Sequence, residues 1–201
     1  ESNKIHVLRE LHFPHSLGLL YSAFTAFCGL EVNEGEYSLM GMAPYGEPKY
    51  VDKVYKLIDV SQDGSFSLDM DYFSFHRSTK HMFSNNFLRL FGAPKDPRRS
   101  EVVDPYYADV AASIQMVTEE VLLRIANHLH QETGLTKLCL AGGVALNSVA
   151  NGRILRETPF EEIYIQPAAG DGGGALGAAL YAYHIVLNNP RAFVMNHAYW
   201  G

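Results

Sequence analysis

The feature that most constrains this 201-residue chain is the segment QPAAGDGGGALG at residues 166–177, which directly follows the short apolar run IYI. Glycine runs let backbone N–H groups approach a ligand closely, and the N-terminus of a following helix attracts negative charge. Asp171 lies inside this run, where its carboxylate would repel a bare phosphate. The segment therefore favours a metal ion that bridges Asp171 and a phosphate, or a ligand hydroxyl that donates to the carboxylate. A plain strand-to-helix turn with Asp171 as the N-cap residue is a third interpretation.

A second glycine loop follows another expected strand, in LCLAGGVALN at residues 138–147. Gly142 and Gly143 would let a purine or a phosphate come close to the backbone, and the amide of Asn147 can donate to a phosphate or ribose oxygen. A tight turn that needs its glycines for packing alone is the other interpretation. Two glycine-rich loops after neighbouring strands would form opposite lips of one cleft, which packing does not require. The pair therefore favours a nucleotide site.

The spacing of Gly172, Gly174 and Gly177 also satisfies G-x-G-x-x-G after a strand, which is a pattern of dinucleotide-binding loops. No acidic residue follows at the position that would hold a ribose, and the sequence indicates no further strand after the helix. A dinucleotide fold is therefore the weaker interpretation.

Strands and helices alternate along the second half of the chain, which is typical of an α/β fold with a largely parallel sheet. Asp104 and Pro105 are a typical cap and first residue of a helix, and Gly134 is a typical end, so one long helix is expected between them. Ligands of such sheets bind at the carboxyl ends of the strands, where both glycine loops lie. The other elements are expected over residues 5–13 (strand), 16–29 (helix), 137–141 (strand), 144–155 (helix), 162–166 (strand) and 173–187 (helix).

Residues 31–104 differ in character, because glycine and proline interrupt every periodic run. We interpret them as an irregular insertion, with a short helix over 50–58 and a strand over 65–69, set into an α/β unit made of residues 1–30 and 105–201. Glu36 lies in this insertion, within EVNEGEYSLMGMAPYGEPKY. Its carboxylate could accept ribose hydroxyls, or it could belong to an ordinary solvated acidic loop.

The charge balance argues against nucleic acid as a partner, and the composition indicates neither a membrane span nor export. Sixteen basic residues against 22 acidic ones give a formal net charge of −6. No long apolar stretch and no signal peptide are present. Cys28 and Cys139 lie in separate apolar segments, which predicts buried reduced thiols and a cytoplasmic protein. Because the chain begins ESNKIHVL, without Met, we expect it to be a piece of a longer protein.

Four segments together resemble the O-carbamoyltransferase family of nodulation protein NodU and the cephamycin and tobramycin carbamoyltransferases. They are FPHSLGLLYSAFT (13–25), GEYSLMGMAPYGEPKY (35–50), LAGGVALNSVANGRILRETPFEEIYIQPAAGDGGGALGAA (140–179) and NHAYWG (196–201). The resemblance covers nearly the whole chain. It implies the later half of an actin-like, Hsp70-like ATPase domain of ribonuclease H-like fold, without the upstream half and without the downstream adenylate-forming domain of the parent protein.

The resemblance also implies an activity. In the family, ATP and carbamoyl phosphate give carbamoyl-adenylate, from which the carbamoyl group passes to a hydroxyl of a small-molecule acceptor. The residues expected to hold the adenylate are Gly142, Gly143, Asn147, Glu36, Gly172 and Gly173.

Asp171 matches the family's aspartate that completes a site for a divalent metal, iron or Mg/Mn, and it is the expected catalytic residue. The other metal ligands of the family are a histidine pair spaced H-x-x-x-H, and no such spacing occurs in this sequence. We therefore expect the metal site to be incomplete in this chain and the chain alone to be inactive. The alternatives are a non-catalytic nucleotide-binding module or a sugar kinase of the same ATPase superfamily. An exposed half-domain face could support a homodimer.

Overall fold

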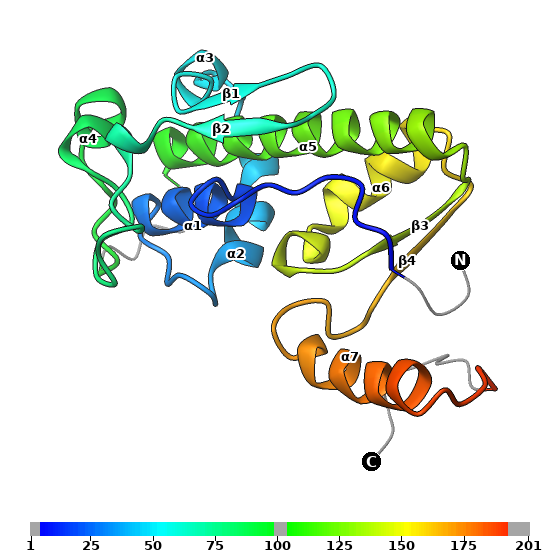
Figure 1. Ribbon diagram of the computed structural model, residues 1–201. Helices are drawn as coiled ribbons and strands as arrows, with labels where there is room; N and C mark the ends of the chain where they lie inside the picture. Colours follow the sequence, from blue (N-terminus) through cyan, green and yellow to red (C-terminus); the bar gives the residue numbers. More distant parts are fainter. Residues whose placement is uncertain (1–4, 99–103, 193–201) are drawn as a thin grey trace.

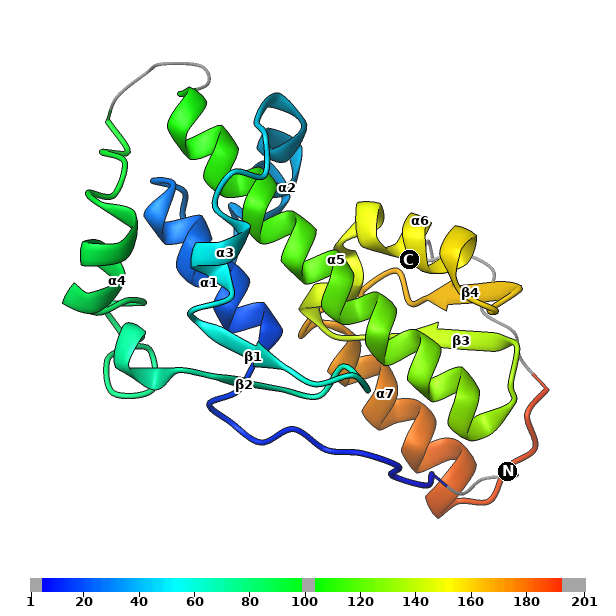
Figure 2. The ribbon, with the colours of Figure 1, turned by 90° about the horizontal axis from the view of Figure 1, so that it is seen from above.

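The structure is a computed structural model that describes residues 5–98 and 104–192. The closing NHAYWG motif therefore lies outside the described residues. The fold is mixed α/β, as the sequence predicts, and one long helix, α5 (Pro105–Thr133), runs through its centre. We call the elements before α5 the helical region (residues 15–98) and those after it the sheet region (residues 137–187); Figure 2 shows most of the helical region on one side of α5 and the two parallel strands of the sheet region on the other. The finer assignment to an actin-like ATPase domain, and the division into an α/β unit and an insertion, stay predictions.

Helix α5 begins and ends where its sequence predicts. The Asp104 side chain accepts a hydrogen bond from the Tyr106 N–H at 2.9 Å, and Pro105 occupies the first turn. Gly134 ends the helix in the left-handed conformation, with φ of 66°. Because both ends are capped within the local sequence, the long helix can serve both regions as a common packing surface.

The helical region has the main apolar core. Helix α1 (Leu17–Phe27) begins after Ser16, whose hydroxyl accepts from the Leu19 N–H at 3.2 Å. Most of its residues are buried, and it packs against α5. Aromatic rings join α1 to α4 (Asn85–Phe91): the centroids of Phe24 and Phe91 lie 5.2 Å apart in an edge-to-face arrangement. The remaining elements of this region are α2 (Glu36–Met42), the 3₁₀ turns Ala43–Tyr45 and Met70–Tyr72, α3 (Val51–Val54), and the antiparallel strands β1 (Ile58–Val60) and β2 (Phe66–Leu68).

The sheet region is thinner. Strands β3 (Lys137–Leu140) and β4 (Glu162–Ile165) pair in parallel, as predicted. Leu138 faces α5 and α6 (Ser148–Glu157) within a small core, whereas Tyr164 on the other face is exposed. Helix α7 (Gly173–Tyr181) lies on the side of the sheet away from α5 and buries no residue (Figure 1). The sheet region therefore depends on α5 and α6 for nearly all of its packing.

Several expected elements differ from the structure. The strand expected over 5–13 is wrong: these residues form no strand, and Ile5 is 82% exposed. An alternating pattern forms a strand only beside a neighbour that completes its hydrogen bonds. The helix expected over 50–58 is shortened to α3, and the one over 144–155 splits into a 3₁₀ turn (Gly143–Leu146) and α6. The last helix turns into a π-helix over Ala182–Val186.

Two further observations concern the expected environment of the protein. Both cysteines are free, but Cys139 is exposed on the open face of β3, so the expectation that both thiols are buried is wrong for it. Within residues 5–98 and 104–192, no helix is both long enough and apolar enough to cross a membrane.

Candidate functional site

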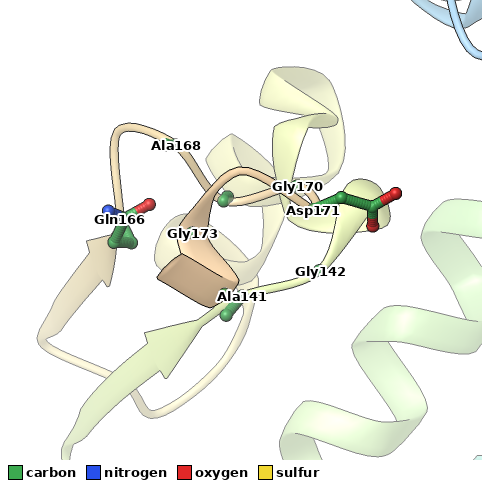
Figure 3. A pocket seen from close by; sticks show the side chains of 9 residues that line it. Ala141, Gly142, Gln166, Ala168, Gly170, Asp171 and Gly173 are labelled. Carbon is green, nitrogen blue, oxygen red and sulfur yellow. The ribbon is translucent and has the colours of Figure 1, made fainter. Parts of the chain in front are cut away.

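A cleft of about 790 Å³ lies where the helical region meets the two glycine loops. Its walls include Glu36 from α2, three residues of the first loop and Asp171 of the second, so five sequence-predicted residues share one cavity: Glu36, Gly142, Gly143, Asn147 and Asp171. A smaller hollow of about 490 Å³ lies between the two loops, and Gly173 lines it (Figure 3). Gly172 joins Asp171 to Gly173 as the N-cap residue of α7. Residues of the loops after β3 and β4 thus line the same two hollows, while the ligand site expected between these loops stays a prediction.

The first loop requires glycine at its turn. Gly142 has φ of 95°, a conformation that L side chains rarely adopt, and a Cβ there would meet no atom within 4 Å. Its N–H donates to the Ala169 carbonyl of the second loop at 2.7 Å. This bond fixes the spacing of the two lips, while the open space beside Gly142 leaves the backbone accessible to a ligand.

The second loop turns its acidic side chain into the cleft. Figure 3 shows the Asp171 carboxylate directed away from Gly173 and from Gln166 at the end of β4. Helix α7 has no side-chain cap, so the interpretation of Asp171 as an N-cap residue is wrong. Behind it, a Cβ on Gly173 would lie 2.4 Å from the Ala168 carbonyl oxygen. Glycine at 173 thus lets the loop close tightly, while Asp171 keeps its carboxylate free of hydrogen bonds to the residues described.

Glu36 opens α2 and faces the cleft from the opposite side. One carboxylate oxygen, Oε1, accepts from the Ser22 hydroxyl at 2.7 Å and from the Asn33 N–H at 3.1 Å. The other oxygen has no donor among the residues that the structure describes. Glu36 is thus a held carboxylate rather than part of a freely solvated loop, and its second oxygen is able to accept a ligand hydroxyl.

Asn147 lies deeper than its sequence position suggests. It is 9% exposed and is the N-cap residue of α6, where its Oδ1 accepts from the Ala150 N–H at 3.0 Å. The same amide makes two hydrogen bonds with Gln115 of α5. Asn147 still borders the cleft, so its contact with a ligand stays a prediction.

Sequence reasoning missed the polar residues behind the loops. Tyr21 and Ser22 of α1 and Thr118 of α5 line the cleft, and the Thr118 hydroxyl is buried without a hydrogen-bond partner in the described structure. Burial, together with nearby negative charge from Glu119, raises the pKa of Tyr21 well above its usual value. The available signal was the presence of polar side chains on otherwise apolar helix stripes, since Thr118 follows the buried Val117.

The metal expected at Asp171 does not fit the residues at hand. Within the described parts of the chain, no group of three or more His, Cys, Asp or Glu side chains lies close enough to hold a metal ion. Asp171 alone contributes one carboxylate, and one ligand holds a divalent ion weakly. The described residues around Asp171 therefore do not form a metal site by themselves.

The chain belongs to the family described as Carbamoyltransferase N-terminus, whose model matches residues 1–180. It is 33% identical over 198 residues to nodulation protein NolO of Bradyrhizobium diazoefficiens, covering 97% of this chain and 34% of that protein. It is 33% identical over 195 residues to nodulation protein NolNO of Sinorhizobium fredii, covering 94% of this chain and 26% of that protein. An uncharacterized protein of Synechocystis, sll1178, is 57% identical over 183 residues, covering 90% of this chain and 29% of the relative. The chain thus spans about a third or less of the length of these relatives.

Proposed function

We propose that this chain forms the nucleotide-holding part of an ATP-dependent O-carbamoyltransferase. In the proposed reaction, water releases phosphate from carbamoyl phosphate, and the resulting carbamate displaces pyrophosphate from ATP to give carbamoyl-adenylate. The carbamoyl group then passes to a hydroxyl of a small-molecule acceptor. Family membership supports the transferase class. The observation that carries the proposal is the single cleft in which Glu36, the first glycine loop and Asp171 meet. An actin-like ATPase fold and a cytoplasmic location belong to the same proposal.

In this proposal, each part of the cleft contacts a different part of the adenylate. The free oxygen of Glu36 accepts a ribose hydroxyl, and the backbone at Gly142 and Gly143 approaches the phosphate. The N-terminus of α7, formed by Gly172 and Gly173, favours the negative charge of the leaving AMP. These contacts hold the adenylate so that its carbamoyl carbon faces Asp171.

Transfer then needs a positioned hydroxyl. The acceptor oxygen attacks the carbamoyl carbon, the bond from that carbon to the AMP phosphate oxygen breaks, and the hydroxyl proton passes to the Asp171 carboxylate. The bonding electrons leave with AMP. A divalent metal, iron or Mg/Mn, would draw its remaining ligands from beyond the described residues.

The test compares the full natural polypeptide that contains this segment with its Asp171→Ala variant. The assay measures pyrophosphate release from ATP that depends on carbamoyl phosphate, and carbamoyl transfer to a panel of hydroxyl acceptors. We expect transfer to fall about 100-fold or more in Asp171→Ala. Asp52→Ala, at an exposed position of α3, is the matched control and should transfer at the wild-type rate.

Other outcomes would replace the proposal. Nucleotide binding without any dependence on carbamoyl phosphate would indicate a non-catalytic module. ATP-dependent phosphorylation of a sugar without carbamoyl phosphate would indicate a kinase of the same superfamily.

A further inference from the structure

Behind the first glycine loop, five polar side chains form one continuous network across three helices. Gln115 of α5 is its centre: its Oε1 accepts from the Tyr21 hydroxyl at 2.9 Å, and its Nε2 donates to Glu119 Oε1 at 2.7 Å. Gln115 also pairs with Asn147 in both directions, accepting from Nδ2 at 3.0 Å and donating to Oδ1 at 3.1 Å. Arg153 of α6 completes the network by donating to Glu119 Oε2 at 2.9 Å.

The network has a fixed direction. An ionised carboxylate only accepts hydrogen bonds, so Glu119, held by Arg153, requires Gln115 to present its NH₂ group. The Gln115 carbonyl oxygen is then left for two donors, the Tyr21 hydroxyl and the Asn147 amide. Without this ion pair, the oxygen and the NH₂ group of the Gln115 side chain could exchange places at little cost. The ion pair therefore sets the orientation of Gln115.

The orientation of Gln115 in turn fixes the orientation of the Asn147 side-chain amide. Its Oδ1 faces the Gln115 amide and the Ala150 N–H, so its NH₂ group is held in one orientation by two separate elements. One Nδ2 hydrogen goes to Gln115, and the second has no acceptor among the residues described. Because Asn147 borders the cleft, this second N–H is the available donor for a ligand oxygen.

We propose that Gln115 and Glu119 are positioning residues that hold the Asn147 amide with its donor toward an oxygen of the nucleotide in the cleft. The inference rests on the proposed function, because it requires a phosphate- or ribose-bearing ligand beside Asn147. Neither residue touches the ligand, and both act through Asn147. A purely structural role, fastening α5 to α6, would affect stability alone.

The experiment measures AMP binding by calorimetry in the full natural polypeptide. Gln115→Met keeps the length of the side chain and removes its hydrogen bonds, while Asn147→Ser keeps a helix-capping oxygen and removes the N–H donor. We expect each single variant to bind AMP about 3- to 10-fold more weakly, as for one lost hydrogen bond. In the Asn147→Ser background, Gln115→Met should have no further effect on AMP affinity, because residues that act through one contact are not additive.

Two further variants sharpen the test. Glu119→Gln keeps a hydrogen-bonding partner but lets the amide direction reverse, so a smaller loss of AMP affinity is expected. Gln131→Met, at an exposed position of the same helix, is the matched control and should bind AMP as the wild type does. In each variant, the melting temperature is recorded beside the affinity.

The outcomes separate the inference from the function on which it rests. A wild-type polypeptide that binds AMP, with Gln115→Met that melts earlier but binds equally well, would overturn the positioning role alone. Equal losses from Gln115→Met with and without Asn147→Ser would do the same. A wild-type polypeptide that binds neither AMP nor ATP would overturn the nucleotide function itself, and with it this role of Asn147.

Discussion

The helical region and the sheet region contribute to the cleft in opposite ways. The helical region has a continuous core of aromatic and aliphatic side chains, and it offers the cleft a side chain, Glu36, that its neighbours hold in place. The sheet region has a small core around Leu138, and it offers mainly backbone, from Gly142 and from the loop around Asp171. Side-chain contacts need packed neighbours, whereas close backbone contacts need side chains to be absent.

This difference explains why the two regions share α5. A segment rich in glycine buries little apolar area, so it cannot build a core of its own. The first loop instead attaches to α5 through the Gln115–Asn147 pair and to the second loop through the bond from Gly142 to Ala169. The accessible backbone of the glycine loops is thus held in place by α5, which packs against the larger core.

The largest expected effect contrasts the two regions directly. Phe27 is fully buried among the rings of α4, whereas Tyr181 of α7 is 54% exposed. Phe27→Ala should lower the free energy of unfolding by about 3–5 kcal/mol, and Tyr181→Ala by less than about 0.5 kcal/mol. Urea unfolding of the 201-residue chain measures both. Similar losses in the two variants would contradict the difference in packing.

A smaller loss of stability is expected when either of two glycines, Gly46 or Gly142, is replaced by alanine. A Cβ on Gly46 would lie 2.2 Å from the Ala108 carbonyl oxygen of α5, so Gly46→Ala should cost about 1–3 kcal/mol of stability. In Gly142→Ala, the new Cβ would meet no atom within 4 Å, but an alanine is strained at φ of 95°. This strain should lower the free energy of unfolding by about 1 kcal/mol.

The sharper difference between these variants is expected in AMP binding by the full polypeptide. Gly142→Ala places a methyl group beside the candidate ligand and should weaken binding, whereas Gly46→Ala should leave the affinity of the folded protein unchanged. Equal affinities in both variants would mean that the backbone at Gly142 does not approach the nucleotide.

Local signals predicted much of this fold, because they act over a few residues. The cap at Asp104, the left-handed Gly134 and the runs before each glycine loop place α5, β3 and β4 correctly. The strand expected over 5–13 failed because a strand depends on a partner that the local pattern does not reveal. The same limit applies to residues 31–98, where short elements are defined by packing on α1 and α5 rather than by their own periodicity.

The candidate site shows the same limit. Glycine loops are recognisable from sequence because glycine is the residue type that adopts a positive φ without strain, as at Gly142. Gln115 is not recognisable, since its partner Asn147 lies 32 positions away and only the fold brings the two together. The deeper position of Asn147 follows from the 3₁₀ turn before α6, which the pattern does not distinguish from a continuous helix.

The smallest expected effect tests whether the helical region can be loosened by pH alone. Asp109 of α5 accepts from the Glu47 N–H at 2.8 Å and from Lys49 Nζ at 2.9 Å, and these bonds hold its pKa below the usual value. Stability from a lowered pKa is present above the ordinary carboxyl value near 4 and is lost as pH falls through the folded value. Asp109→Asn should therefore unfold about 1 kcal/mol more easily at pH 7, with the gap closing as the pH falls below about 4. Urea midpoints across this range measure the gap, with exposed Asp52→Asn as the control. A gap that stays constant with pH would mean that the contact of Glu47 and Lys49 with α5 does not depend on the Asp109 charge.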